Sequence, residues 1–343
     1  MKLSDFNYIL PPKQIAQTPA EPRDSSKLMI LDRNNGQIQD KIFSDISGML
    51  WENDVLVVNK TRVIKARLKW IIWESEKKCE IFLHKQIKDS TWDCLVYPGK
   101  KLKPETVIHF SGTQMTWKIQ SISEKWRIVE FTQGWNEFLD TVEWIGESPL
   151  PPYIKDSESP SERYQTVYND KEKSGSVAAP TAGLHFTAEL LEKLEKKWVI
   201  IEKVLLHVGL GTFANVEIED VTKHHMHSEY IEIDKETAQR LNQYKASWKR
   251  IIAVWTTSVR TLESMSDSNW QMKHGNMDTQ IFIYPGYEWK FVDSIITNFH
   301  LPQSTLLMLV SSFASQEIIK KAYEHAVESD YRFFSFWDAM WID

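Results

Sequence analysis

Glycine, cysteine and long apolar runs are all scarce in this chain of 343 residues. The two cysteines, Cys79 and Cys94, are too few for a disulfide framework and too far apart for a CxxC motif, so we expect reduced thiols. No apolar run approaches the roughly 18 residues that a membrane helix needs, and residues 1–5 lack the apolar segment of a signal peptide. We therefore expect neither a membrane protein nor a secreted one, but a soluble protein of the cytoplasm.

The shortage of glycine accompanies an excess of tryptophan. A typical glycine content of about 7% would give roughly 24 glycines, whereas the chain has 12 glycines and 15 tryptophans. The charges nearly balance, since 41 Lys and Arg against 47 Asp and Glu give a net charge of −6. Binding of an acidic partner would therefore depend on local clusters of basic residues.

The spacing of short apolar runs predicts two domains, which fits a chain of this length. Between about 70 and 145 the apolar residues alternate with a period of two, in runs at 79–84, 92–97, 107–110, 115–120 and 126–131. Short strands separated by turns predict a small antiparallel β-barrel. We expect this inserted β-barrel domain at 70–149, within an α/β domain formed by 1–69 and 150–343.

The remaining sequence alternates strands with helices, so the expected fold class is α/β with a helix-covered sheet. Strands are predicted at 28–32, 54–59, 199–208, 250–254, 280–283 and 292–299. Helices are predicted to begin after Thr187, a suitable N-cap, and near 235, 258, 304 and 316.

Polar loops follow several of these strands, at the end of the sheet where open α/β proteins bind ligands. His207 precedes the turn 208–213, whose glycines allow close approach of a ligand, and is either an acid–base group or a satisfied core histidine. His185 ends a loop of small residues just before a helix N-terminus that favours an anion. His185 either contacts an anionic ligand bound there or makes only a structural contact with the helix N-terminus.

Hydroxyl and amide groups follow two further strands. Thr256, Thr257 and Ser258 come after the strand 250–254, where they either bind a ligand or cap a helix. Asn298 and His300 end the strand 292–299, so in an open sheet they would lie in the same crevice.

Two clusters of charged or metal-binding residue types occur. The segment 224–229 contains three histidines and Glu229, but adjacent histidines cannot share one strand face, so we expect no metal site. The segment 60–69 contains five basic residues and no acid, and it indicates either a phosphate-binding patch or a solvated face. These five residues are Lys60, Arg62, Lys65, Arg67 and Lys69.

Ordered motifs extend from one end of the chain to the other, and together they resemble the S-adenosylmethionine:tRNA ribosyltransferase-isomerase family of queuosine biosynthesis. They lie at 16–24, 57–64, 149–154, 162–168, 176–187, 206–213, 226–229, 256–264, 283–287, 296–302 and 331–336. The longest include Leu206-His-Val-Gly-Leu-Gly-Thr-Phe213 and Ile296-Thr-Asn-Phe-His-Leu-Pro302.

The resemblance implies an α/β domain with an inserted β-barrel and a reaction on tRNA. The ribosyl group of S-adenosylmethionine would be transferred to 7-aminomethyl-7-deazaguanine at the wobble position, giving epoxyqueuosine and releasing adenine and methionine. S-adenosylmethionine would be a co-substrate, with no further cofactor, and the protein would act as a monomer. A non-catalytic RNA-binding module and an S-adenosylmethionine-dependent RNA methyltransferase are the competing interpretations.

This chemistry needs an acid, a base and polar groups that hold the donor. The candidates for proton transfer are His185, His207, His227, Glu229, His300 and Asp338. The candidates for the nucleoside and amino-acid ends of the donor are Gly209, Gly211, Thr212, Thr256, Thr257 and Ser258. Further substrate-binding candidates are Asn59, Thr181 and Asn298, with Arg62, Arg67 and Arg260 for a carboxylate or phosphate.

Four tryptophans stand where the resemblance implies glycine. They are Trp198, Trp248, Trp255 and Trp337. Glycine at a turn between a strand and a ligand allows positive φ and close backbone approach, which tryptophan does not allow cheaply. We hypothesise that UGA codons that mean glycine in the source organism are written here as tryptophan. Trp92 is different, because it fits an alternating barrel strand.

Overall fold

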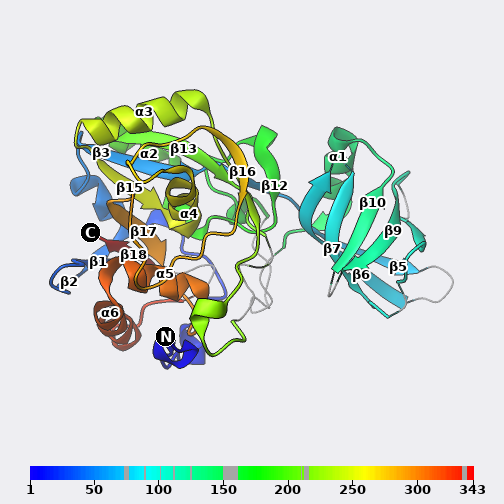
Figure 1. The fold of residues 1–343 in the computed structure, drawn as a ribbon, viewed down its shortest axis with the longest axis horizontal. Coiled ribbons are helices and arrows are strands. Elements are labelled where there is room, and N and C mark those ends of the chain that lie inside the picture. Colours follow the sequence, from blue (N-terminus) through cyan, green and yellow to red (C-terminus); the bar gives the residue numbers. More distant parts are fainter. Residues whose placement is uncertain are drawn as a thin grey trace. The chain divides into compact units, whose positions relative to one another are not determined.

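The computed structural model places the chain in two compact units (Figure 1). It describes residues 1–72, 77–88, 90–100, 102–110, 113–123, 126–149, 161–209, 211, 216–333 and 338–343. The first unit comprises Met1–Thr61, Pro151–Lys173 and Ala179–Asp343, and the second comprises Arg62–Leu150 and Ser174–Ala178. Within the described ranges, no helix combines the length and the apolar character that a bilayer span requires.

A mixed sheet forms the centre of the first unit, with nine strands among the described residues. Their order is β16 (Gly275–Thr279), β14 (Glu229–Ile233), β13 (Ile200–Leu206), β3 (Asp54–Asn59), β15 (Arg250–Val254), β17 (Ser294–Asn298), β18 (Ala339–Ile342), β1 (Lys27–Leu31) and β2 (Ile38–Ile42). The four neighbours β13, β3, β15 and β17 are parallel. Every residue of β3 and β17 is buried, as expected for strands covered on both faces.

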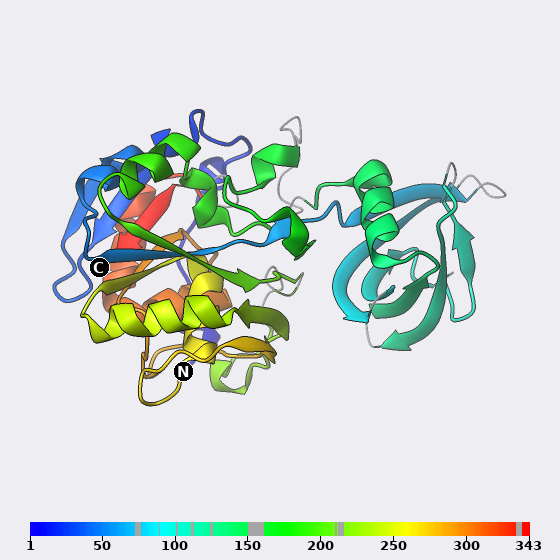
Figure 2. The ribbon, with the colours of Figure 1, turned by 90° about the horizontal axis from the view of Figure 1, so that it is seen from above.

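The helices described in the first unit are α2 (Ala188–Glu195), α3 (Lys235–Ala246), α4 (Trp255–Met265), α5 (Thr305–Ala314) and α6 (Gln316–Glu328). Helices α2 and α3 contact β13, and α5 packs against α6. Helix α4 contacts all four parallel strands, and Figure 2 shows α3 lying alongside them. Thr187 is the N-cap of α2, because its hydroxyl accepts a hydrogen bond from the Leu190 N–H over 3.0 Å. Short 3-10 turns cover Leu3–Phe6, Pro12–Gln14, Arg23–Ser25, Phe43–Gly48, Ser161–Tyr164, Lys171–Lys173, Thr181–His185 and Val221–Lys223.

The second unit contains a curled antiparallel sheet, a half-barrel with seven strands in the described part of the chain. The order is β11 (Gly146–Glu147), β5 (Arg67–Ile72), β6 (Lys77–Lys88), β7 (Thr91–Tyr97), β10 (Trp126–Phe131), β9 (Thr116–Ser123) and β8 (Val107–His109). Helix α1 (Trp135–Ile145), which the sequence pattern did not predict, places Phe138 5.7 Å from the Trp92 ring. A short parallel pair joins β4 (Arg62–Val63) to β12 (Ser174–Ser176).

Most predicted elements are confirmed within a few residues, but two predictions are wrong. The strand expected at 280–283 lies instead at Gly275–Thr279. Its neighbour β14 begins at Glu229, which pairs with Thr279, so β14 has no residue left to pair with 280–283. Helix α4 begins at Trp255, three residues before its predicted start, because it follows β15 without a loop.

A buried carboxylate fixes the segment that leads into β17. Glu263 of α4 is fully buried, and its Oε1 accepts hydrogen bonds from the N–H groups of Phe291 (2.9 Å) and Val292 (3.0 Å). Its Oε2 accepts from the Lys290 N–H and the Tyr287 hydroxyl, each at 3.0 Å. An ionised carboxylate has acceptors and no donor, so it matches these four converging donors.

Glu263→Gln should therefore lower the free energy of unfolding by about 2 to 4 kcal/mol, because an amide NH2 would face N–H donors. Urea denaturation would measure this loss. Glu195→Gln, at an exposed position of α2, is the control and should change stability by less than about 0.5 kcal/mol. Equal effects of the two substitutions would contradict the structural role of Glu263.

Candidate functional site

The candidate site lies where the four parallel strands end. Because β13, β3, β15 and β17 are neighbours with the same direction, their carboxyl ends share one edge of the sheet. Asn59, Trp255 and Asn298 lie at this edge, and His207 directly follows β13. This is the position in which open α/β sheets bind ligands.

Asn59 connects three of these strand ends. Its Nδ2 donates to the Leu206 carbonyl oxygen over 2.9 Å and to Thr257 Oγ1 over 3.1 Å. Its Oδ1 accepts from the N–H groups of Leu206 and Thr61, each at 3.1 Å. The amide is fully buried and uses both of its ends, so Asn59 positions its neighbours.

The ring of His207 is held by Thr61, which lies two residues after the end of β3. The ring atom Nδ1 lies 2.8 Å from Thr61 Oγ1, and the ring stacks 5.7 Å from that of Tyr230. Burial lowers the pKa of His207 to about 4, against a partly opposing effect of Glu232. The imidazole is therefore neutral at pH 7, which is the form that accepts a proton.

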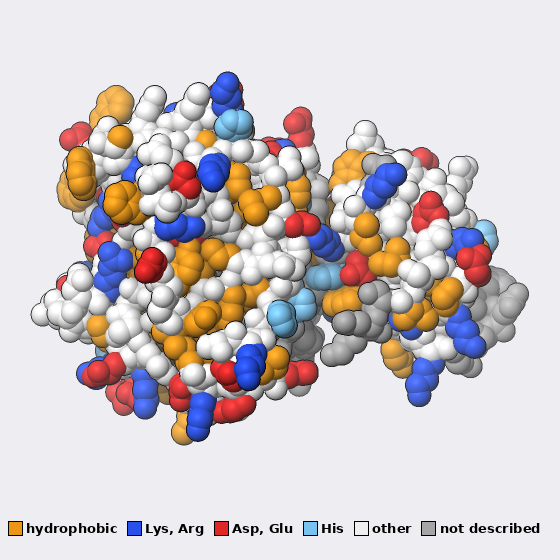
Figure 3. All heavy atoms as spheres, in the orientation of Figure 1, with side chains coloured by type: hydrophobic (Ala, Val, Ile, Leu, Met, Phe, Trp, Pro, Cys, Tyr) orange, Lys and Arg blue, Asp and Glu red, His pale blue; other side chains and the backbone are white. Residues whose placement is uncertain are grey.

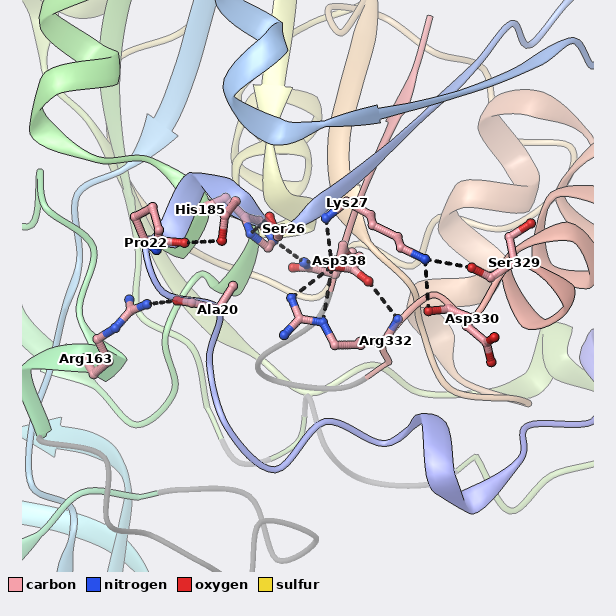
Figure 4. Close-up of polar contacts among 12 residues, drawn as sticks. Ala20, Pro22, Ser26, Lys27, Arg163, His185, Ser329, Asp330, Arg332 and Asp338 are labelled. Atoms are coloured by element: carbon pink, nitrogen blue, oxygen red, sulfur yellow. Dashed lines mark hydrogen bonds and ion pairs between the residues drawn. The ribbon is translucent and has the colours of Figure 1, made fainter.

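His185 lies in the 3-10 turn before α2 and is bonded on both sides of its ring (Figure 4). Asn298 Nδ2 lies 2.8 Å from His185 Nε2, and Ser26 Oγ lies 2.8 Å from Nδ1. Because Asn298 Oδ1 accepts from the Thr181 hydroxyl over 3.1 Å, Asn298 Nδ2 is the donor to His185. His185 then carries its proton on Nδ1 and donates it to Ser26.

The surroundings of His185 favour the neutral ring. Burial lowers its pKa to about 3, and the nearby guanidinium groups of Arg332, Arg163 and Arg23 act in the same direction. With both ring nitrogens occupied, His185 serves as a fixed polar group that orients Asn298.

Asp338 is an anchor within the same region (Figure 4). Its Oδ1 accepts from the Lys27 N–H and from Arg332 Nη2, each at 2.9 Å, and its Oδ2 accepts from the Arg332 N–H at 2.8 Å. A carboxylate that is 1% exposed and accepts hydrogen bonds from these donors is held in one orientation, with both of its oxygens in use. The geometry therefore favours a positioning role for the sequence-predicted catalytic Asp338.

A buried ion pair joins Arg260 of α4 to Glu229 at the start of β14. The side chains of Arg260 and Glu229 are 6% and 4% exposed, and burial lowers the pKa of Arg260 to about 10. Glu229 Oε1 also accepts from the Gly209 N–H over 3.1 Å. Among the described residues, Arg260 Nε and Nη2 and the buried Ser258 hydroxyl have no hydrogen-bond partner. Such groups suit a ligand that brings acceptors and donors of its own.

His300 is placed differently from the other candidates. It is fully buried, its Nε2 lies 3.0 Å from Thr297 Oγ1, and its N–H donates to the Tyr323 hydroxyl over 2.8 Å. Burial lowers its pKa to about 3. The Trp255 ring lies 5.4 Å from it, so this histidine belongs to an aromatic core beneath α4.

The glycine turn contacts His227. A side chain at Gly211 would overlap the His227 ring, so glycine allows this close packing, and His227 itself is exposed. Thr212 lies outside the described residues. In the ranges that the structure describes, no group of three or more His, Cys, Asp or Glu side chains could hold a metal ion.

The two remaining candidates, Arg62 and Arg67, belong to the second unit. Arg67 lies 3.5 Å from Glu80, and its neighbours Lys65 and Lys69 pair with Glu143 and Glu147 at 3.2 and 2.5 Å. On the face visible in Figure 3, basic and acidic side chains are interspersed. The basic run in the sequence is thus partly neutralised in the fold.

Sequence reasoning missed three residues of the site. Ser26 bonds His185, Thr61 bonds His207 and Arg332 bonds Asp338. Thr61 and Arg332 lie inside the motifs at 57–64 and 331–336, and Ser26 closely follows the motif at 16–24. Their position in or next to the motifs marked them as candidates, but nothing in the sequence indicated which residues they would bond.

The first unit is a mixed α/β fold with buried polar groups at the carboxyl edge of its parallel strands, and the second unit is an antiparallel insertion. These features are typical of α/β proteins that bind a ligand at this edge. Residues 3–342 match the family described as queuosine biosynthesis protein. The chain therefore belongs to the queuosine biosynthesis protein family, which confirms the resemblance in the sequence.

Named relatives match over their full length. The S-adenosylmethionine:tRNA ribosyltransferase-isomerase of Finegoldia magna is 50% identical over 344 residues, covering 100% of this chain and 99% of that protein. The protein of the same name from Desulforamulus reducens is 48% identical and both chains are covered completely. The crystal structure of S-adenosylmethionine tRNA ribosyltransferase from Thermotoga maritima matches with a TM-score of 0.58 and 36% identity, covering 99% of this chain and 100% of that one.

The lowered pKa values make folding stability depend on pH. An unfolded histidine titrates near 6.5, so below that pH the unfolded state binds protons that folded His185 and His207 do not. Stability is full above about pH 6.5 and falls toward pH 4. Between pH 6 and 5, His207→Gln should reduce the slope of unfolding free energy against pH by roughly 1 kcal/mol per unit.

Urea titrations at several pH values would measure this slope. His109→Gln, which replaces an exposed ring on β8, is the control and should leave the slope as it is. An unchanged slope for His207→Gln would show that this ring gains no protons on unfolding.

Proposed function

We propose that the protein is an S-adenosylmethionine:tRNA ribosyltransferase-isomerase. It transfers and isomerises the ribosyl group of S-adenosylmethionine onto 7-aminomethyl-7-deazaguanine at the tRNA wobble position, forming epoxyqueuosine and releasing adenine and methionine. The observation that carries this proposal is full-length similarity, near 50% identity, to two enzymes of that name. We also propose that the reaction takes place in the cytoplasm, where a tRNA substrate would be available. No cofactor beyond the co-substrate is proposed.

The reaction sets four chemical demands. A base removes the acidic proton beside the sulfonium, adenine leaves, the amine of the modified base attacks the sugar, and methionine departs as the epoxide closes. The protein must also hold the carboxylate and hydroxyl groups of the donor while these steps occur.

Arg260 is proposed to bind the carboxylate of the methionine moiety. Its side chain is 6% exposed, and its Nε and Nη2 are without partners in the described residues. These two N–H groups form one edge of the guanidinium, which matches the two oxygens of a carboxylate. Ser258, two residues before Arg260 on α4, is a second buried group without a hydrogen-bond partner among the described residues.

His207 is proposed as the general base. With its proton on Nδ1, the ring donates to Thr61 Oγ1 and leaves a lone pair on Nε2, which forms no hydrogen bond within the described residues. Its pKa of about 4 keeps this lone pair free at neutral pH. His185, whose two nitrogens are both occupied, is proposed as a positioning residue that fixes Asn298 and Thr181.

The acceptor tRNA requires positive charge near the site. The guanidinium groups of Arg23, Arg163 and Arg332 are close enough to His185 to lower its pKa. We propose that Arg163 and Arg332 contact tRNA phosphates, and that Arg62 of the second unit also binds the tRNA. Arg67 is paired with Glu80, just as Arg332 is with Asp338 and Arg163 with Glu21, so each would contact a phosphate through its remaining N–H groups.

Incubation with S-adenosylmethionine labelled in both its adenine and its methyl group, together with tRNA carrying the modified base, tests the activity. We expect free adenine and labelled methionine. Release of S-adenosylhomocysteine would indicate a methyltransferase instead, and binding of tRNA without turnover would indicate a passive RNA-binding module.

Two substitutions separate the proposed roles. His207→Gln should lower kcat by roughly a hundred- to ten-thousand-fold with little change in donor affinity, because it removes only proton transfer.

Arg260→Lys should raise the donor KM by roughly tenfold or more, because lysine cannot form two parallel hydrogen bonds to a carboxylate. Steady-state release of adenine measures both, and a normal kcat for His207→Gln would remove it from the mechanism.

A further inference from the structure

Four tryptophans have backbone conformations that favour glycine. The φ angles of Trp198, Trp248, Trp255 and Trp270 are 65°, 57°, 75° and 59°. Among the described residues, tryptophan accounts for four of the eight non-glycine positions with positive φ. Only a few per cent of non-glycine residues adopt this region, Asn, Asp and His are several-fold enriched there, and a bulky residue is an outlier. Chance does not place a bulky side chain there four times.

Two of the four occupy the same motif at a helix end. The Trp198 N–H donates to the Glu195 carbonyl oxygen over 2.9 Å, and the next residue, Val199, donates to Leu194 over 3.1 Å. Trp248 repeats this pattern after α3, with bonds of 3.1 and 3.0 Å. This is the Schellman motif, in which the residue with positive φ is usually glycine.

Trp270 closes a tight turn between Ser266 and Met272, which form a bridge. Its N–H donates to the Asp267 carbonyl oxygen over 3.1 Å, and the Asp267 N–H donates to Gln271 over 3.0 Å. A three-residue hairpin loop of this kind places its left-handed residue at a bulge, where glycine is the usual occupant.

The exposed members gain nothing from packing that would offset this backbone strain. Trp198, Trp248 and Trp270 are 77%, 93% and 60% exposed. In contrast, Trp92, Trp117 and Trp341 lie in strands, are at most 2% exposed and have no positive φ. These seven tryptophans thus fall into three that pack in the core and four that occupy glycine-like backbone positions.

We infer that positions 198, 248, 255 and 270 are glycine in the protein that the source organism makes, because its UGA codons specify glycine. This explains the four φ angles, and it reduces both the shortage of glycine and the excess of tryptophan. Trp270 was not suspected from the sequence, and Trp337 lies outside the described residues.

If position 255 is glycine, the shape of the candidate site changes. This consequence rests on the proposed function. Trp255 is 4% exposed and is the first residue of α4, directly before Thr256, Thr257 and Ser258. Its indole fills space beside His300 at the carboxyl edge of the sheet. Glycine there would open this space and expose backbone N–H groups of the helix N-terminus to the donor.

The gene sequence tests the inference directly. We expect UGA at codons 198, 248, 255 and 270, and UGG at codons 92, 117 and 341. UGG at the four positions would overturn the inference.

Thermal unfolding gives a second test that is independent of activity. Trp198→Gly, Trp248→Gly and Trp270→Gly should each raise Tm by roughly 1 to 3 °C, because they relieve the left-handed strain. The control is Trp144→Gly, which removes a tryptophan of similar exposure (68%) from helix α1 and should lower Tm. A lower Tm for the three variants would overturn the inference.

Calorimetric titration with S-adenosylmethionine tests position 255. Trp255→Gly should bind the donor at least tenfold more tightly than the printed chain, whereas Trp255→Phe, which keeps a bulky ring, should not. Unchanged affinity in Trp255→Gly would overturn the role of this position at the donor site. Tight binding without adenine release would leave the glycine assignment intact and contradict the proposed function instead.

Discussion

The organisation of the site depends on Asn59. A single buried amide bonds the end of β13 through both backbone groups of Leu206, and it also bonds Thr257 in the first turn of α4. Strand β3 lies between β13 and β15, so only a residue at its carboxyl end can reach both neighbours. Because every polar atom of this amide is used in a fully buried setting, the strand ends are held in fixed register. His207 directly follows β13, and Arg260 lies in α4, the helix that directly follows β15, so their positions depend on these strand ends.

Burial gives the site its chemical character. It lowers the pKa values of His185 and His207 to about 3 and 4, so both rings are neutral hydrogen-bonding groups rather than cations at pH 7. Arg260 remains charged despite its burial, since a pKa of about 10 is still well above neutrality. Its charge is paired with Glu229, while its Nε and Nη2 have no hydrogen-bond partner among the described residues, and such unpaired buried donors are costly in a folded protein.

The backbone adds a second kind of information. Hydrogen bonds at Trp198, Trp248 and Trp270 form motifs that glycine normally occupies, although the printed side chain is the largest of all. The sequence directed suspicion to positions 198, 248 and 255 through family resemblance and glycine content. Only the φ angles identify Trp270, because a turn of that type has no sequence signature once its glycine is replaced.

By itself, the sequence determined most of the elements and the family. Period-two alternation predicted the strands of the second unit, apolar runs predicted β3 and β15, and Thr187 predicted the start of α2, because these signals are local. The tertiary structure decided which polar groups meet. Ser26 and His185 are 159 residues apart, and Asn59 and Leu206 are 147 apart. Such pairs depend on the order of strands in the sheet, which periodicity does not encode, and burial then sets the pKa values that local sequence cannot reveal.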